Sequence, residues 1–140
     1  MSKRTVAVGL KIPDNEAYTA LTALERLGIP LARVERSAIY VFQAPAPEDE
    51  LAARVTRNES VFNPNKHRLR VLDANAPRSG EVWIEEIGAR WVDADRYVGW
   101  RLFGAGDRPV DRATLAAAAE RLLCNPAIER AHFPKNEEER

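Results

Sequence analysis

The sequence predicts an α+β protein in which helices cover one face of an antiparallel sheet. Three observations lead to this class. Short apolar runs that alternate every second residue indicate strands, and amphipathic runs with 3.6-residue spacing indicate helices. In addition, an Asn-Pro dipeptide ends a helical run at two places, Asn63-Pro64 and Asn125-Pro126, and a short apolar segment follows each. This recurrence favours an internally duplicated scaffold, although Asn-Pro is also an ordinary helix stop.

The first half of the chain predicts the element order β-α-β-β-α-β. Asp14 or Asn15 can cap the first helix, and Gly28 supplies its left-handed exit. Two β-prone strands follow and form a predicted hairpin, with Ser37 and Ala38 between them. This is the ferredoxin-like order, in which two helices lie on one face of the sheet. The strands are expected over residues 5–12, 31–36, 39–43 and 67–72, and the second helix over residues 48–58.

The second half predicts the same unit with one helix lost. Asp111 caps its clearest helix, Arg112 to Cys124, which is rich in alanine and leucine. The strands are expected over residues 81–87, 97–103 and 128–133, with residues 90–92 as a further candidate for the sheet.

Length and composition fit one domain, or two very small ones that share a core. The chain has 140 residues, of which 45% are apolar, and this is enough to form a core. The stretch "DANAPRSG" is the clearest loop and therefore the best boundary. The predicted divisions are a first unit over residues 1–73, a linker over 74–80, a degenerate second unit over 81–134, and a mobile charged tail over 135–140.

Charge and cysteine content exclude several classes of function. The 21 basic and 21 acidic residues balance, which argues against a dedicated nucleic-acid binder. The single cysteine, Cys124, excludes an intrachain disulfide and a cysteine-rich zinc site. No apolar run approaches transmembrane length and no secretory leader precedes Thr5. We therefore expect a cytoplasmic protein with no membrane partner.

The sequence contains no pattern that specifies a cofactor. The glycine-rich loops that hold nucleotide phosphates are missing, and no cofactor or metal is predicted. The two histidines, His67 and His132, fall in strands that the proposed repeat makes equivalent, but further ligands at metal-binding spacing are not evident. The carboxylate pairs Glu85-Glu86 and Asp93/Asp95 have the chemistry of an acid and a base, yet solvated strand ends explain them more simply.

The best candidate site is cationic. In the strand near residues 66–71, Lys66, Arg68 and Arg70 share one face. Three adjacent cations repel one another unless an anion offsets them. A phosphate, an acidic helix or an acidic neighbouring subunit would each do so. The alternative is a solvent-facing edge strand whose charges prevent aggregation.

Two stretches resemble the PurS family, the small subunit of phosphoribosylformylglycinamidine synthase in purine biosynthesis. Residues 10–42, "LKIPDNEAYTALTALERLGIPLARVERSAIYVF", resemble its opening strand, helix and hairpin. Residues 116–133, "AAAAERLLCNPAIERAHF", resemble its closing helix and strand. The most specific match is Leu122 to Glu129, which is similar to the family pattern Leu-Leu-x-Asn-Pro-Val-Ile-Glu. Family members are shorter, so the resemblance covers either residues 5–72 or a doubled arrangement.

The resemblance implies an accessory subunit of an ATP-dependent amidotransferase complex that catalyses nothing by itself. Such subunits self-associate and bridge the synthetase subunit to the glutaminase subunit, which supplies ammonia. A duplicated chain would take the place of a pair of them. We therefore expect a homo-oligomer, with the synthetase and glutaminase subunits as partners.

The chain departs from the family pattern in two loops. Residues 12–16 replace the family's glycine-rich entry to the first helix, and residues 35–38 lack the glycine and lysine of its hairpin. Because contacts are made by such loops, no partner-contact role is assigned to these positions. The alternatives are a diverged paralogue with another partner, a small-molecule-binding regulatory module with its ligand at a subunit interface, and a small enzyme that uses the carboxylate pairs.

Overall fold

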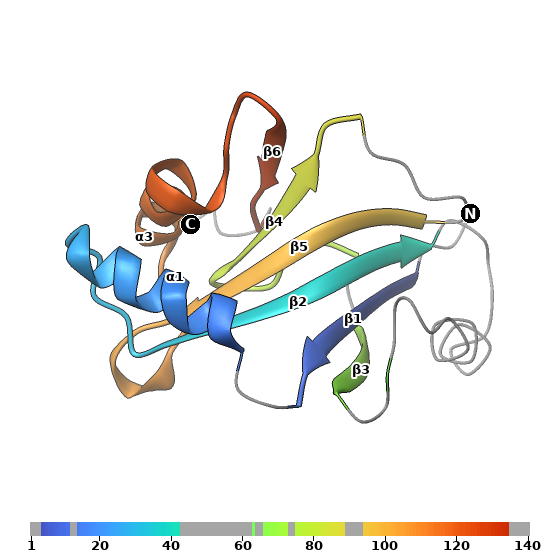
Figure 1. Ribbon diagram of the computed structural model, residues 1–140, viewed down its shortest axis with the longest axis horizontal. Coiled ribbons are helices and arrows are strands. Elements are labelled where there is room, and N and C mark those ends of the chain that lie inside the picture. Colours follow the sequence, from blue (N-terminus) through green and yellow to red (C-terminus); the bar gives the residue numbers. More distant parts are fainter. Residues whose placement is uncertain are drawn as a thin grey trace.

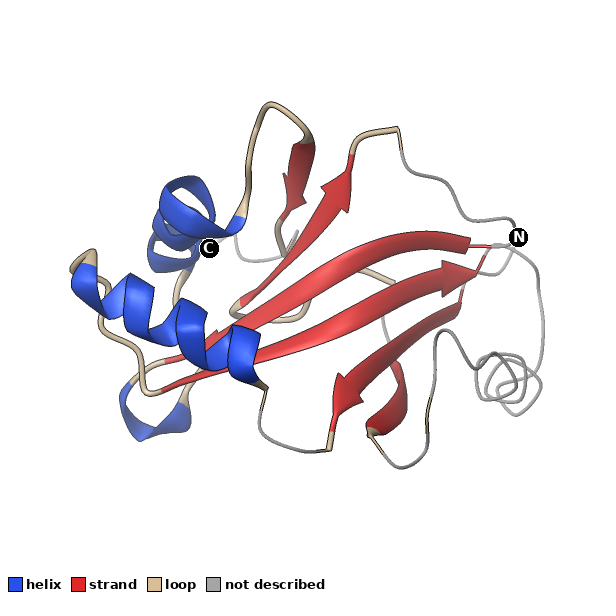
Figure 2. Cartoon of the chain, in the orientation of Figure 1, coloured by secondary structure: helices blue, strands red, loops and turns tan. Residues whose placement is uncertain are grey.

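In the part of the chain that the structure describes, the protein forms one six-stranded antiparallel sheet in the order β3-β1-β2-β5-β4-β6, with two helices (Figures 1 and 2). This confirms the predicted α+β class. The computed structural model describes residues 4–11, 14–42, 63, 66–72, 75–88 and 94–134. The strands are β1 (Arg4–Leu10), β2 (Arg33–Phe42), β3 (His67–Leu72), β4 (Glu81–Glu86), β5 (Ala94–Phe103) and β6 (Glu129–His132), and the helices are α1 (Asn15–Arg26) and α3 (Arg112–Ala118). The predicted helix over 48–58, the strand over 90–92 and the tail over 135–140 lie outside the described residues.

Both helices begin at capping aspartates. Asp14 accepts hydrogen bonds from the backbone N–H groups of Glu16 and Ala17 at 3.0 and 3.1 Å, and Asp111 accepts one from Thr114 at 2.8 Å. Side-chain acceptors at this position satisfy amides that have no partner within the helix. Gly28 follows α1 with φ +87°, as expected for a left-handed helix exit. One turn of π-helix, Ala119–Leu123, extends α3.

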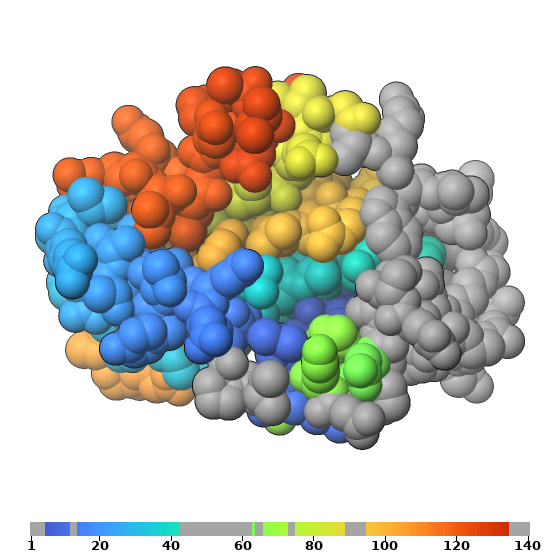
Figure 3. All heavy atoms as spheres, in the orientation of Figure 1, coloured from blue at the N-terminus to red at the C-terminus, as the bar shows by residue number. Residues whose placement is uncertain are grey.

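A shared core places both helices on the same face of the sheet. Leu24 of α1 and Leu115 of α3 are fully buried in one apolar cluster with Leu102 of β5. The cluster also contains the inward-facing residues of β4, Val82 and Ile84. The two helices meet in the space-filling view (Figure 3). None of the described helices has the length and apolar composition needed to cross a membrane.

The predicted hairpin about Ser37 and Ala38 is wrong. These residues lie inside β2, a continuous strand of 10 residues. Ser37 pairs with Gly9 on one side and Gly99 on the other, and Ala38 pairs with Val8 and Val98. Neither residue has the positive φ that tight hairpin turns require. Pairing on both sides therefore keeps the chain extended through this point.

The strand order relates the two halves of the chain by an approximate two-fold arrangement. Each half places its first strand in the middle (β1 or β4), its second at the junction (β2 or β5) and its third at the outer edge (β3 or β6). The halves meet where β2 pairs with β5 from Arg33↔Phe103 to Phe42↔Ala94. They therefore share one continuous sheet.

The described residues that flank the two Asn-Pro dipeptides make the same hydrogen bonds. The N–H of His67 donates to the carbonyl of Asn63 at 2.7 Å, and the N–H of Glu129 donates to the carbonyl of Asn125 at 2.7 Å. In each segment, the side chain of the residue four positions after the asparagine accepts a hydrogen bond from the asparagine N–H. His67 Nδ1 accepts it at 2.8 Å in the first, and Glu129 Oε1 at 2.8 Å in the second.

The hydrogen bonds beyond the turns match as well. Lys11 N–H donates to Lys66 O at 2.7 Å, and Ile87 N–H donates to Ile128 O at 2.8 Å. The first bond extends the β1·β3 ladder and the second extends the β4·β6 ladder. Since the same bonds recur at equivalent places, they favour an internal duplication. The division of the chain into two units stays a prediction.

Candidate functional site

The predicted cationic strand is an edge of the described sheet. Arg68 and Arg70 of β3 are exposed and lie opposite Gly9 and Ala7 of β1. Directly paired residues of antiparallel strands point to the same face, and these four lie on the face away from the helices. Lys66 is exposed in the turn before β3.

Arg68 and Arg70 line a depression of about 250 Å³ beside this edge. Lys66 does not line it. The charged residues of the lining are four arginines against two carboxylates, so the depression is net positive. These charged lining residues are Asp14, Glu35, Arg36, Arg68, Arg70 and Arg78.

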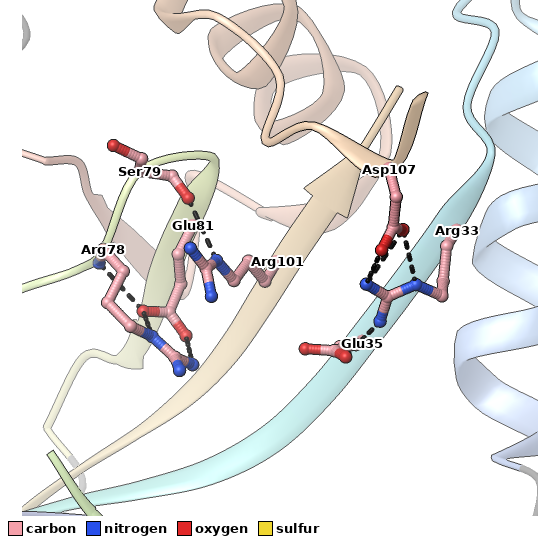
Figure 4. Close-up of polar contacts among 7 residues, drawn as sticks. All are labelled: Arg33, Glu35, Arg78, Ser79, Glu81, Arg101 and Asp107. Atoms are coloured by element: carbon pink, nitrogen blue, oxygen red, sulfur yellow. Dashed lines mark hydrogen bonds and ion pairs between the residues drawn. The ribbon is translucent and has the colours of Figure 1, made fainter. Parts of the chain in front are cut away.

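Arg78 belongs to the depression because a buried carboxylate holds it there. Glu81, only 1% exposed, accepts hydrogen bonds from Arg78 Nε at 3.1 Å and from its terminal nitrogen at 2.8 Å. It also accepts one from the Arg78 backbone N–H at 2.9 Å. These bonds raise the pKa of the Arg78 guanidinium. Two parallel bonds fix the plane of a guanidinium as well as its position, so Arg78 is held in place (Figure 4).

The segment before β4, predicted as a linker, is packed against the second half of the sheet. Gly80 has φ +72°, and a Cβ at this position would lie 2.8 Å from Pro109 Cβ. Its carbonyl accepts a bond from Leu102 N–H at 2.8 Å. Only glycine tolerates both the conformation and the contact. This turn directs Arg78 back toward β3.

A further arginine adds positive charge near the depression. Arg101 of β5 pairs with Glu81 in the sheet register and donates from Nε to the carbonyl of Ser79 at 3.1 Å. Partial burial, and then the nearby charge of Arg78, lower the pKa of Arg101. Like charges nearby disfavour protonation, so the charge of Arg78 adds to the effect of burial.

Two other arginines near the depression, Arg33 and Arg36, are neutralised by carboxylates. Arg33 forms ion pairs with Glu35 and with Asp107, the latter at 3.0 Å (Figure 4). On the helix-bearing side, Arg36 pairs with Asp14 at 3.2 Å and with Glu16 at 3.0 Å. Both carboxylates that line the depression therefore already have a cationic partner.

The depression lies at a notch in the sheet. β1 pairs with β2 only as far as Gly9↔Ser37, whereas β5 pairs with β2 down to Arg33. Leu102 of β5 uses its N–H and C=O for bonds to Gly80 and Val110. Its partner Val34 consequently turns its own N–H and C=O away from β5, toward the notch. Gly9 has no side chain and that of Ser37 is short, which leaves room there.

The other predicted candidates are not brought together at this site. His67 and His132 lie in equivalent strands but on opposite faces, since His67 pairs with Leu10 and His132 with Trp83. His132 Nε2 contacts Glu85 Oε1 at 2.8 Å. Within the described ranges no three acidic, histidine or cysteine side chains form a metal-binding group.

The described members of the carboxylate pairs, Glu85, Glu86 and Asp95, do not line the depression. Glu85 lies beside Tyr97, whose pKa is raised by burial and then by the charges of Asp95 and Glu85, while Glu86 is exposed. Asp93 lies outside the described residues. Cys124 is half-buried, and burial followed by the charge of Glu129 raises the pKa of its thiol, which disfavours a nucleophilic thiolate.

Sequence reasoning missed Arg78, Glu81 and Arg101. The available signal was weak: an arginine three residues before an acid, with Ser-Gly between them, at the start of a strand. An acid in that place is normally solvated, and only the structure shows Glu81 buried.

Comparison with known proteins adds no family to this picture: no protein-family model matches the chain, and no curated protein does.

Proposed function

We propose that this protein is a PurS-like, non-catalytic assembly subunit of phosphoribosylformylglycinamidine synthase, or a diverged paralogue of that subunit. The observation that supports the proposal most is that the described residues flanking the two Asn-Pro dipeptides make equivalent hydrogen bonds. One of these dipeptides lies within the Leu-Leu-x-Asn-Pro-x-Ile-Glu motif at Leu122 to Glu129. In this proposal each half is a variant of a ferredoxin-like unit in which one long strand, β2 or β5, replaces a hairpin.

The sheet supports a scaffold in which one chain takes the place of two subunits. β2 and β5 pair along their whole length, so both halves are held in a fixed relation without a second chain. A rigid sheet can position two partner proteins, because a surface of paired strands changes little on binding. The outer strands of the described sheet, β3 and β6, offer edges for self-association in this proposal.

Isolation of the full-length tagged protein from its own cells tests the assigned role. We expect the synthetase and glutaminase subunits to co-purify at constant ratios, and reciprocal tagging of either partner to recover this chain. An untagged strain is the control for non-specific capture. Reproducible absence of both partners removes the assigned role and leaves the fold unaffected.

A second candidate function is a regulatory module that binds a small molecule. The net positive depression beside β3 favours it. The two candidates are compatible, since a scaffold subunit can also bind a ligand.

A further inference from the structure

We propose that the depression formed by Arg68, Arg70 and Arg78 binds the phosphate group of a small phosphorylated molecule. This inference does not depend on the PurS-like role, because it rests on the charges and shape of one surface of the isolated chain.

The charge balance leaves two arginines for a ligand. Within the described part of the chain, Arg36, Arg78 and Arg33 each pair with a carboxylate. Neither Arg68 nor Arg70 forms a hydrogen bond or ion pair with a described residue. A phosphate monoester carries between about −1.5 and −2 charges at neutral pH. Two guanidinium groups that have no partner among the described residues match that charge.

The donors around the depression suit a tetrahedral anion. Arg68 and Arg70 are successive outward residues on one face of β3, so their guanidinium groups approach from one side. Arg78 approaches from the loop before β4, with its orientation fixed by Glu81. Val34 and Ser37 also line the depression, and the main-chain N–H of Val34, which should point away from β5, and the Ser37 hydroxyl can serve as further donors. Guanidinium and main-chain N–H groups are the usual ligands of phosphate oxygens.

The size of the depression selects a small ligand over a protein segment. Its volume is about 250 Å³, slightly below the range of about 300–1,000 Å³ typical of sites for drug-sized molecules. An α-helix with its side chains is about 10–12 Å across and does not enter it. A phosphate with a few attached carbon atoms does.

The floor of the depression also fits this ligand. It contains Ala7 and Gly9, which have short or no side chains, beside Ser37. A Cβ added to Gly9 would lie 3.4 Å from Ser37 Oγ. The absence of larger side chains lets an anion approach the sheet surface closely.

Calorimetric titration of the full-length chain with inorganic phosphate and with glycerol 3-phosphate, at low ionic strength, tests the proposal. We expect saturable binding of both, with glycerol 3-phosphate binding at least as tightly. Uncharged glycerol should give no binding. Each hydrogen bond between a guanidinium group and the phosphate contributes to the free energy of binding. We therefore expect about tenfold weaker binding from either of two substitutions, Arg68→Gln and Arg70→Gln. Raising the salt concentration should weaken it as well, since both side chains are exposed.

Arg130→Gln is the matched control. Arg130 lies in β6 at the place that Arg68 has in β3, five residues after the asparagine of the same turn, and is likewise exposed. The substitution removes the same charge as Arg68→Gln, but Arg130 does not line the depression. Phosphate binding should therefore change less than about twofold. An equal loss in Arg130→Gln and Arg68→Gln would mean non-specific attraction and overturn the site. So would no binding at millimolar phosphate, or binding of a glutamate-rich peptide without binding of phosphate. None of these results bears on co-purification with the synthetase and glutaminase.

Discussion

Replacement of Glu81 by alanine is expected to lower the free energy of unfolding by about 3–5 kcal/mol. Glu81 is 1% exposed, and its carboxylate accepts three hydrogen bonds from Arg78. Without it, the guanidinium of Arg78 loses its partner at a place where only 22% of the side chain is exposed. A charge that is mostly shielded from water costs free energy when it loses its partner, because water solvates it only in part. Urea unfolding followed by tryptophan fluorescence measures the change.

Glu86→Ala is the control, because Glu86 is an exposed acid on the same strand. Its effect should stay within about 0.5 kcal/mol. The double variant Arg78→Met/Glu81→Leu should recover most of the lost stability, since apolar residues of similar volume often replace a buried ion pair without loss. Equal effects of Glu81→Ala and Glu86→Ala would show that Glu81 is solvated.

Leu115→Ala is expected to destabilise the protein by about 2–5 kcal/mol. Leu115 is fully buried in the cluster that joins α1 and α3 to the sheet. Removing its side chain loses apolar burial and leaves a cavity that the surrounding strands fill only in part. The same unfolding experiment measures the effect.

Leu122→Ala makes the same chemical change at a position that is 41% exposed. Because both residues are in the same helical segment and alanine is a good helix former, the pair separates burial from helix propensity. The effect of Leu122→Ala should be within about 0.5 kcal/mol. If the two variants lose equal stability, the packing of α3 against the sheet is not as described.

The periodic signals predicted most elements of the fold. Alternation placed β1, β3, β4 and β6 within a few residues of their observed bounds, and Asp14 and Asp111 are the observed helix caps. The break expected at Ser37 was wrong because local composition does not show that Gly9 and Gly99 pair with it from both sides. Long-range pairing keeps such a segment extended despite its weak local preference for a strand.

The candidate site could be predicted only in part. The alternation of Arg68 and Arg70 placed them on one face, and the structure brings both to the depression. Arg78 joins them only because the turn at Gly80 and the burial of Glu81 bring it back toward β3. Neither feature has a local sequence pattern, since each depends on contacts with residues distant in the chain.

All of these proposals require that the two halves form one sheet through β2 and β5, and a cross-strand disulfide tests this most directly. Ala38 and Val98 are directly paired. Leu102 directs its main-chain groups away from β2. Because this direction alternates along a strand, Val98 should do the same, toward its other partner Ile84 in β4. The Cα atoms of Ala38 and Val98 should therefore be about 4.5 Å apart, within the range that a disulfide spans.

In a Cys124→Ser background, Ala38→Cys/Val98→Cys should oxidise completely under mild conditions and retain the native far-ultraviolet spectrum. Ala38→Cys/Arg96→Cys is the control: Arg96 pairs with Tyr40, which leaves this diagonal pair about 7–8 Å apart. It should stay reduced. Ready oxidation of the diagonal pair, or failure of the direct pair to oxidise in the folded protein, would contradict the joined sheet.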